Sequence, residues 1–307
     1  GFCPVLAANM HWEEVDRLDE PPSLSAYYEL ASSSRPFIIN SDGVKRWNWP
    51  CFDGRWKDVG YFCAHPQVKF TRHEMQMSSF VTYKKGVFSS DAGIPACEAL
   101  NKLCDRENEE LADERFYLRA WEYDPPADDE DCIQKYDHKG KKIVDDIGIG
   151  VPFATCLLEA SRQPALDALS KLMHWLFIGE SETGTETHVD PIGTHAWMWL
   201  ASGEKHWRIV VVAGQESSSI TCQDNESLPD LFDCKAVARW CSHCTLLQAS
   251  LRPGELIFVP SQAVHSVRNA GRGVSVAVSH NYIDVVCLAT MFRTLAMALR
   301  SFLDWRQ

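Results

Sequence analysis

The chain has 307 residues, 45% hydrophobic and 23% charged, so it can bury the core of one large domain or of two smaller ones. Its formal net charge of -12 argues against sequence-independent nucleic-acid binding, which needs basic side chains, and suits a basic protein partner better. It shows no signal-peptide-type run, no stretch apolar enough for a membrane span and no small-domain disulfide spacing among its 12 cysteines, so we expect an intracellular protein of the nucleus or cytoplasm, with no membrane partner.

The first half of the chain mixes short elements with polar connections. Residues 124–132 carry an acidic run that we interpret as a solvated loop rather than a binding segment. The sequence patterns predict, in chain order, a helix at 24–32, a strand at 37–40, a strand at 75–83, a helix or long loop at 92–112, and a strand at 115–121.

The pattern changes at residue 173. Six short runs rich in Val, Ile, Trp and Phe follow within about 110 residues, separated by Gly, Pro and Ser turns. Such spacing is typical of a sandwich or a barrel of jelly-roll type. We therefore expect a mainly β fold with flanking helices. The expected domain comprises residues 1–283, with an N-terminal extension of helices and strands and a core at 173–283.

The last segment, 284–307, is expected to be a separate C-terminal helix. Its apolar residues recur in steps of four and three, which predicts an amphipathic helix. This face either packs on the barrel or pairs with a second copy of the chain as a homodimer, and the sequence leaves both open. The apolar residues are Leu288, Phe292, Leu295, Leu299 and Phe302.

A candidate metal site begins with the run THVDP, which contains His188 and Asp190. On a strand, positions two apart point to the same side, so an imidazole and a carboxylate would face one point. His265, at the end of another predicted strand, is the candidate third ligand. Two imidazoles and one carboxylate leave coordination positions open, an arrangement that suits non-haem iron(II) oxygenases. A match of only two residues, H-x-D, also occurs by chance in many proteins. The metal-site hypothesis therefore depends on the β-type segments around the match and on the later His265.

Lys205 opens a strand rich in Trp and Val, where an unpaired ammonium would be costly. A dicarboxylate cosubstrate could pair with it. Ser279 and Asn281, in the last predicted strand, are candidate hydrogen-bonding neighbours.

Three segments together resemble a jumonji C (JmjC) domain, and most closely the small JmjC protein (lysyl) hydroxylases. They read GTETHVDPIGTHAWMWLASGEKHWRIV, PGELIFVPSQAVHSVRN and SHNY. The resemblance is strongest over 173–212 and 251–282 and weaker over 35–125. It implies a double-stranded β-helix, which is a cupin-type barrel.

The resemblance also implies cofactors and roles. Iron(II) would be held by His188, Asp190 and His265, and 2-oxoglutarate would chelate the iron and place its far carboxylate on Lys205. Further candidates for the cosubstrate pocket are Tyr117, Ser279, Thr185 and Asn281. The chain departs from the pattern at Met198, where related hydroxylases often carry Asn, and this puts the substrate in doubt.

One group of cysteines could form a second metal site. Cys222, Cys234, Cys241 and Cys244 lie in one insertion, and four thiolates could hold a structural zinc. The first spacings are irregular, and free cysteines are also common as buried apolar residues.

The function expected from these features is hydroxylation of a protein side chain, Lys or Arg, by an iron(II)- and 2-oxoglutarate-dependent dioxygenase. The alternatives are N-methyl-lysine or N-methyl-arginine demethylation, modification of tRNA, a cupin-type isomerase, and a non-catalytic metal-binding barrel that acts as a scaffold.

Overall fold

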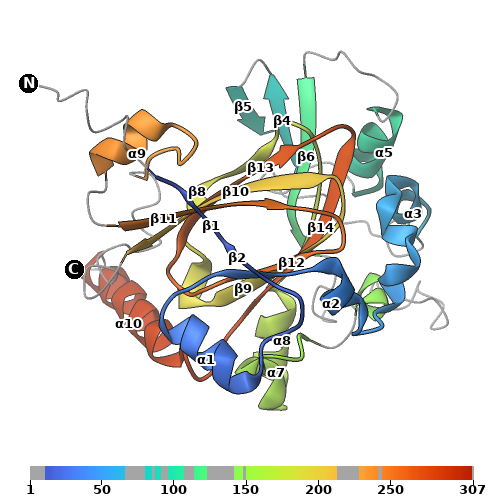
Figure 1. Cartoon of the computed structure of the whole chain (residues 1–307). Coiled ribbons are helices and arrows are strands. Elements are labelled where there is room, and N and C mark those ends of the chain that lie inside the picture. Colours follow the sequence, from blue (N-terminus) through green and yellow to red (C-terminus); the bar gives the residue numbers. More distant parts are fainter. Residues whose placement is uncertain are drawn as a thin grey trace, which may run out of the picture.

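The strands of the computed structural model form two sheets that face each other (Figure 1). The structure describes residues 11–65, 80–84, 87–90, 96–106, 114–122, 142–147, 150–212, 228–240 and 244–305.

The smaller sheet has the strand order β1-β11-β10-β13-β8. The pairs within it are antiparallel except β1 with β11. The strands are β1 (Glu13–Glu14), β8 (Gly184–His188), β10 (Glu204–Val212), β11 (Cys244–Leu251) and β13 (Val264–Ala270).

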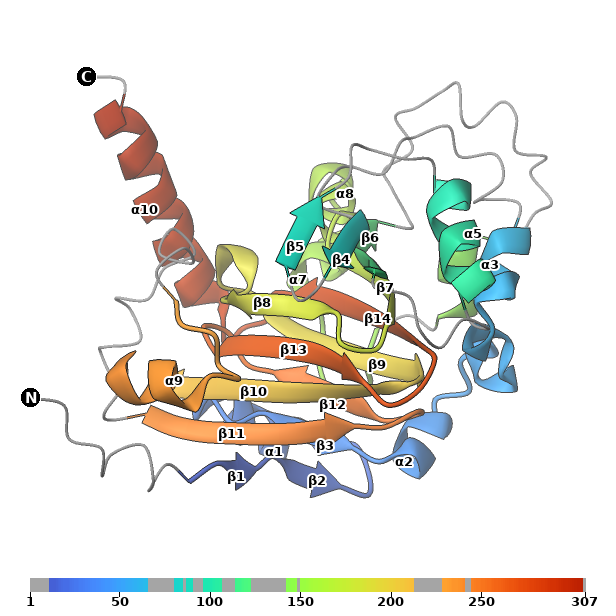
Figure 2. The same ribbon diagram turned by 90° about the horizontal axis from the view of Figure 1, so that it is seen from above.

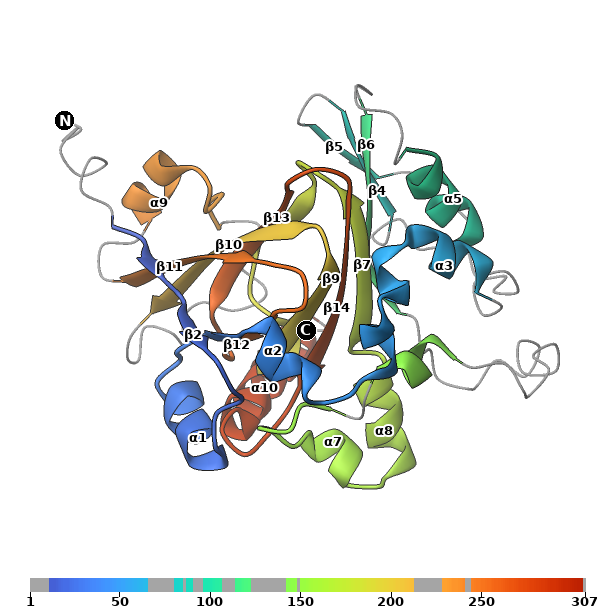
Figure 3. The same ribbon diagram turned by 45° about the vertical axis from the view of Figure 1, so that its right-hand side comes forward.

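The larger sheet has the order β2-β3-β12-β9-β14-β7-β6-β4-β5. Its strands are β2 (Asp16–Leu18), β3 (Phe37–Ile39), β4 (Phe80–Lys84), β5 (Val87–Ser90), β6 (Glu114–Glu122), β7 (His174–Glu180), β9 (His195–Ser202), β12 (Leu256–Val259) and β14 (Val274–Tyr282). Figure 3 shows β13, β10 and β11 on one side of the barrel, with β9, β14 and β7 on the other.

Strand β14 has apolar side chains on both of its faces. Val276 and Val278 point outward into the larger apolar cluster, and Ala277 points inward between the sheets. Because side chains alternate along a strand, the small inner residues leave space in the barrel while the valines bind the sheet to its outer layer. Both faces of β14 are buried from Ser275 to Tyr282, so its polar side chains as well as its apolar ones lie inside the protein.

Helices and tryptophan-rich segments cover the outer face of the larger sheet (Figure 1). The described helices are α1 (Leu24–Ser32), α2 (Ser41–Lys45), α3 (Val59–Ala64), α5 (Ala96–Arg106), α7 (Leu157–Ala160), α8 (Pro164–Lys171), α9 (Cys234–Trp240) and α10 (Leu288–Trp305). Of these, α9 packs against the smaller sheet instead. Single 3-10 turns are η2 (Pro50–Asp53), η3 (Arg55–Lys57), η4 (Ile143–Asp146) and η5 (Pro191–Gly193).

The expected fold class is confirmed, since a mainly β barrel of two sheets carries flanking helices. The helix at 24–32 and the strand at 115–121 lie where the sequence patterns put them, as α1 and within β6. The strand expected at 75–83 begins only at Phe80 in the described chain, and residues 75–79 lie outside the described residues. The acidic run 124–132 also lies outside them.

Helix α10 leaves the barrel after its first turn (Figure 2). Met291 is buried in the main core, whereas Phe292, Leu295 and Leu299 expose 60%, 45% and 59% of their surface. The start of α10 therefore packs on the barrel, whereas most of the apolar face of this helix is exposed. The expected boundary at residues 283 and 284 falls in the short connection between β14 and α10. Among the described helices, none has the length and apolar character needed to cross a bilayer.

Candidate metal centre and cosubstrate pocket

The two candidate histidine ligands are cross-strand neighbours. His188 ends β8 and lies directly opposite His265 of β13, with ring centroids 4.2 Å apart. Asp190 follows two residues later, and its Oδ1 lies 4.0 Å from His188 Nε2. One ligand atom from each residue lies within 4.8 Å of the others, so the structure brings the three together.

The route by which Asp190 arrives differs from the expected one. Strand β8 ends at His188, and Asp190 precedes the 3-10 turn η5 rather than sitting on the strand. Pro191 at the first position of that turn lacks an N–H and cannot continue a strand ladder, so the chain bends there. The carboxylate thus faces the histidines because of a turn, not because of the two-residue strand period.

Both imidazoles are oriented by backbone carbonyls. The Nδ1–H of His188 donates to the Glu186 carbonyl at 2.7 Å, and the Nδ1–H of His265 donates to the Ala263 carbonyl at 3.0 Å. With the proton on Nδ1, each Nε2 keeps its lone pair, which is the form that binds a metal. Desolvation and then the neighbouring His265 lower the pKa of His188 to about 4, so it is neutral at physiological pH.

Packing behind the strands holds these ligands in place. Trp207 stacks on His265 with ring centroids 5.7 Å apart. On the outer side, Val189 and Val264 join an apolar cluster with Val237 of α9. Two imidazoles and a carboxylate, all fixed at one end of the barrel, fit the donor set of a non-haem iron(II) centre with open coordination positions.

Lys205 lies fully buried inside the barrel, four residues along the β10–β13 ladder from the level of His265. At the usual strand rise this separation is about 13 Å. Its Nζ donates to Asn269 Oδ1 at 2.6 Å and lies 5.5 Å from the centre of the Tyr117 ring. Among the described residues no carboxylate forms an ion pair with it, and burial lowers its pKa to about 7. A buried ammonium with an amide and aromatic rings around it is suited to an incoming carboxylate.

The remaining candidate pocket residues line the same interior. Tyr117 Oη lies 3.4 Å from Thr185 Oγ1. Ser279 is buried on β14 opposite Met198, and both lie on the inner side of the larger sheet. Asn281 is buried two residues further on and donates to Thr194 Oγ1 at 3.0 Å. Met198 therefore occupies the pocket wall itself, where its thioether replaces a polar amide.

A β-bulge explains why Thr185 and His188 both face the pocket. Val267 pairs with Thr185 and His265 with His188, so three steps on β8 match two on β13. In a regular strand, residues three apart would face opposite sides, and the extra residue corrects this.

Sequence reasoning missed the residues that support Lys205. Asn269 accepts the Lys205 ammonium and donates through Nδ2 to Thr183 Oγ1 at 2.8 Å. Gly179 lets Tyr117 and Asn269 pack closely against the backbone of β7. A Cβ at this position would lie 2.2 Å from Tyr117 Cδ2 and 2.8 Å from Asn269 Nδ2. Asn269 could have been found, since it lies four residues after His265 on the same strand face.

The cysteines proposed for a structural zinc do not form a described site. Cys222 and Cys241 lie outside the described residues, Cys234 is exposed, and Cys244 is disulfide-bonded. A disulfide sulfur is not a thiolate ligand, so the four-thiolate arrangement is not supported.

Two other histidines have structural surroundings. His195 is buried and its Nδ1 accepts from the Ser261 N–H at 2.8 Å. His206 is exposed beside Glu204. Neither faces the metal centre.

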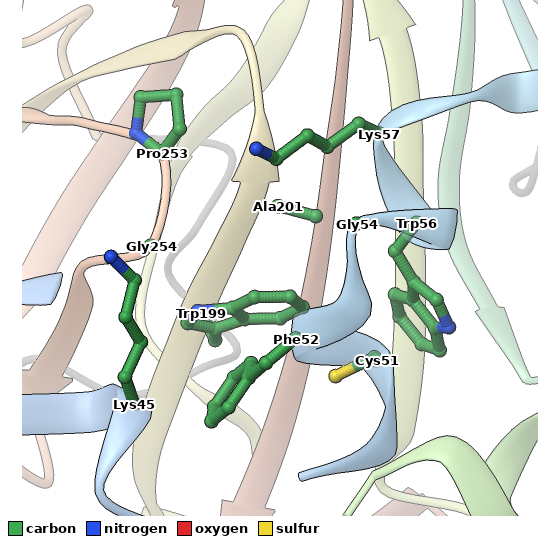
Figure 4. A pocket seen from close by; sticks show the side chains of 10 residues that line it. All are labelled: Lys45, Cys51, Phe52, Gly54, Trp56, Lys57, Trp199, Ala201, Pro253 and Gly254. Carbon is green, nitrogen blue, oxygen red and sulfur yellow. The ribbon is translucent and has the colours of Figure 1, made fainter. Parts of the chain in front are cut away.

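A small surface cavity lies elsewhere on the barrel (Figure 4). It has a volume of about 120 Å³ and lies between the outer face of β9 and the η2–η3 segment. Trp199, Phe52 and Gly254 line it, with Lys45 and Lys57 beside them. Trp199 belongs to the outer cluster, so this cavity is separate from the barrel interior.

Residues 175–280 match the family model described as "JmjC domain, hydroxylase". This part of the barrel therefore matches a JmjC domain. The match contains the metal centre and Lys205, and the resemblance noted in the sequence is confirmed.

Several relatives with described activities match part of the chain. "Bifunctional arginine demethylase and lysyl-hydroxylase psr-1" of Caenorhabditis briggsae is 31% identical over 120 residues, 36% of this chain and 30% of the relative. "2-oxoglutarate and iron-dependent oxygenase JMJD4" of Danio rerio is 28% identical over 140 residues, 43% of this chain and 32% of the relative. "Lysine-specific demethylase JMJ21" of Arabidopsis thaliana is 32% identical over 119 residues, 36% of this chain and 12% of the relative. Each match spans about a third or less of the relative's own length.

Proposed function

We propose that this protein is an iron(II)- and 2-oxoglutarate-dependent oxygenase that hydroxylates a protein side chain. The observation that carries the proposal is the combination of His188, Asp190 and His265 at one end of the barrel with the buried Lys205 at the other. Iron and 2-oxoglutarate appear together in the printed name of one relative. A barrel with the metal triad alone would suit other cupin chemistry, and Lys205 is what favours a dicarboxylate cosubstrate.

The protein residues would have distinct tasks. His188, Asp190 and His265 would hold iron(II), and Lys205 with Tyr117 would bind the far carboxylate of 2-oxoglutarate. Bound together, these cofactors supply an oxidant that places one oxygen atom of dioxygen in a C–H bond, with 2-oxoglutarate converted to succinate and carbon dioxide. The apolar barrel wall of Trp207, Ile209 and its neighbours would exclude water from the reacting groups.

A Lys or Arg side chain is the proposed target. The chain carries a net charge of -12, which favours a basic partner, and two relatives have names that refer to lysine or arginine. N-methyl demethylation is the second candidate, because hydroxylation of an N-methyl group releases formaldehyde. The names of the relatives include both reactions.

The products distinguish these reactions. Iron-loaded protein would be incubated with 2-oxoglutarate and basic peptides that carry unmodified or N-methylated Lys and Arg. A hydroxylase leaves one added oxygen atom on an unmodified peptide, whereas a demethylase releases formaldehyde and shortens the methylated peptide by one methyl group. Mass spectrometry of the peptides, with succinate measured in parallel, reports both.

Matched histidine variants provide the control. His265→Ala should abolish peptide modification and succinate formation, while His206→Ala, at an exposed histidine of β10, should leave both unchanged. Folded, iron-loaded protein that forms no succinate with any of these peptides, or without peptide, would favour the alternative of a non-catalytic metal-binding scaffold.

The exposed part of α10 is the proposed homodimer contact. Phe292, Leu295 and Leu299 form an apolar stripe that the barrel does not cover, and a second copy of the same helix would bury it. Leu295→Glu should convert a dimer to a monomer in light scattering after gel filtration. Met297→Glu introduces the same charge at an exposed position on the opposite face of the helix and should leave the dimer intact. A monomeric wild type would contradict this proposal without affecting the metal centre.

A further inference from the structure

A second cluster of metal-binding side chains lies outside the barrel. One ligand atom each from Cys156, Glu159 and His280 lies within 4.8 Å of the others. Cys156 caps the N-terminus of α7, Glu159 lies within α7, and His280 lies on the outer side of β14, facing away from the pocket. Figure 3 shows α7 and α8 below the ends of β7 and β14. Nothing in the oxygenase chemistry uses these residues.

The distances are those of a coordination shell. His280 Nε2 lies 3.6 Å from Glu159 Oε1, and His174 Nε2 lies 3.8 Å from the same oxygen. His174 and His280 are cross-strand partners with ring centroids 3.9 Å apart. Bond lengths of about 2.0–2.3 Å around a tetrahedral zinc ion separate neighbouring ligand atoms by roughly 3.3–3.8 Å. The two imidazoles therefore converge on the carboxylate at the spacing that zinc ligands adopt.

Ser170 links the same groups. Its hydroxyl donates to Glu159 Oε1 at 2.9 Å and lies 3.3 Å from His280 Nε2 and 3.8 Å from Cys156 Sγ. The Ser170 hydroxyl thus contacts the thiol, the imidazole and the carboxylate at once, and it ties the three candidate ligands to α8.

We propose that Cys156, Glu159 and His280, with His174 at the edge of the cluster, form a structural zinc site. A thiolate, imidazoles and a carboxylate make a donor set that zinc prefers. One thiolate and one carboxylate would balance the two charges of the ion, which a buried site requires. The site would fasten the α7–α8 segment to β7 and β14, the strands that carry part of the pocket wall.

A superficially similar cluster fails the same test. His195, Asp284 and Cys287 also lie within 4.8 Å of one another. However, His195 Nδ1 accepts the Ser261 N–H, so the imidazole proton must sit on Nε2, the atom that faces Asp284 at 3.4 Å. That nitrogen carries a proton where a metal ligand needs a lone pair. The cluster is a buried hydrogen-bond network at the base of α10.

Cobalt(II) substitution tests the zinc site independently of oxygenase activity. A cobalt–thiolate bond gives an intense near-ultraviolet charge-transfer band, and the barrel centre contains no cysteine that could produce one. We expect the metal-stripped protein to develop this band with one equivalent of cobalt at this site. Asp190→Ala, which alters only the barrel centre, should retain the band.

Paired cysteine variants assign the band. Cys156→Ser should lose it, whereas Cys97→Ser, at a half-buried free cysteine elsewhere, should retain it. No band in folded wild type, or an equal band in Cys156→Ser, would overturn the proposal. X-ray absorption of zinc-loaded Asp190→Ala protein gives a second measurement that does not depend on how Cys156→Ser folds. One sulfur among the zinc ligands is expected, and none or several would contradict this site.

Discussion

Lys205 is the residue whose chemistry depends most strongly on its surroundings. Burial lowers its pKa to about 7, from an ordinary value of 10.5, and its ammonium has an amide partner in Asn269 rather than a carboxylate. A bound dicarboxylate would favour the charged form. The cosubstrate should therefore bind best to protein in which Lys205 is protonated.

The affinity for 2-oxoglutarate should consequently fall as pH rises above about 7. Each pH unit above the pKa reduces the charged fraction about tenfold, so the dissociation constant should rise by up to about tenfold per unit. Calorimetric titration between pH 6.5 and 8.5 measures this. Lys205→Met should bind weakly and without this pH dependence, and a dissociation constant that stays flat in wild type would rule out Lys205 as the carboxylate partner.

Lys205 should lower the free energy of unfolding of the protein. Because its pKa is lower in the folded than in the unfolded state, the unfolded chain binds more protons between about pH 7 and 10.5, and stability rises with pH across that window. Lys205→Met should therefore raise the unfolding free energy by about 1–3 kcal/mol near pH 7. The gain should shrink toward pH 9. Thermal unfolding at both pH values tests this, and a destabilised variant at pH 7 would contradict it.

The candidate ligands could be proposed from the sequence, and Asn269 could have been added from its place on the strand face of His265, but the contacts that these residues make could not be predicted. The H-x-D run, the later His265 and Lys205 stand in segments that resemble the JmjC pattern. Asn269 and Gly179 matter through contacts made across strands, which depend on register. The cluster of His174 with His280 is similar, because those residues are opposite one another only once β7 pairs with β14.

At the scale of elements, local irregularities decide the site. The sequence predicts β8 as a regular strand that carries both His188 and Asp190. The structure instead has a bulge after Thr185 and a turn at Pro191. The bulge directs His188 inward, where a regular strand continuing from Thr185 would direct it outward. The two-residue period therefore led to Asp190 as a candidate, but the structure places this residue before a turn and not on a strand.

Strand β7 must approach its neighbours closely at Gly179. An added Cβ would overlap Tyr117 and Asn269, the residues around Lys205. Gly179→Ala should therefore weaken 2-oxoglutarate binding by about tenfold or more, on the order of a 1–3 kcal/mol packing cost. Iron(II) binding should change little, because His188 and His265 lie on other strands. Equal loss of iron and cosubstrate binding would show that the whole barrel is disturbed.

At the scale of the whole molecule, the barrel could be predicted and its outer layer only in part. The β-runs after residue 173 have a clear period and turn signals. The outer layer combines the predicted helix α1 and α5 with short segments from η2, η3 and α3, which are too brief to show an amphipathic period. Their tryptophans and phenylalanines meet on one sheet face through long-range contacts, which propensity alone does not encode.

The net charge of -12 should affect how the protein meets a basic substrate. Attraction between exposed charges weakens as salt shortens the screening length, from about 10 Å at 0.1 M to about 3 Å at 1 M. The KM for a Lys-rich peptide should rise several-fold between 0.05 M and 0.5 M salt, while kcat changes little. Succinate formation without peptide provides the control for salt effects on the centre itself. A salt-independent KM would argue against charge-based recognition.

The central claim is that one barrel holds iron(II) and 2-oxoglutarate through His188, Asp190, His265 and Lys205. Anaerobic titration of iron(II)-loaded protein with 2-oxoglutarate tests it most directly, because the chelate produces a weak visible charge-transfer band. We expect the band in wild type and in His206→Ala, its loss in Asp190→Ala, and a requirement for far more cosubstrate in Lys205→Met. Folded, iron-loaded wild type without the band would contradict the oxygenase assignment.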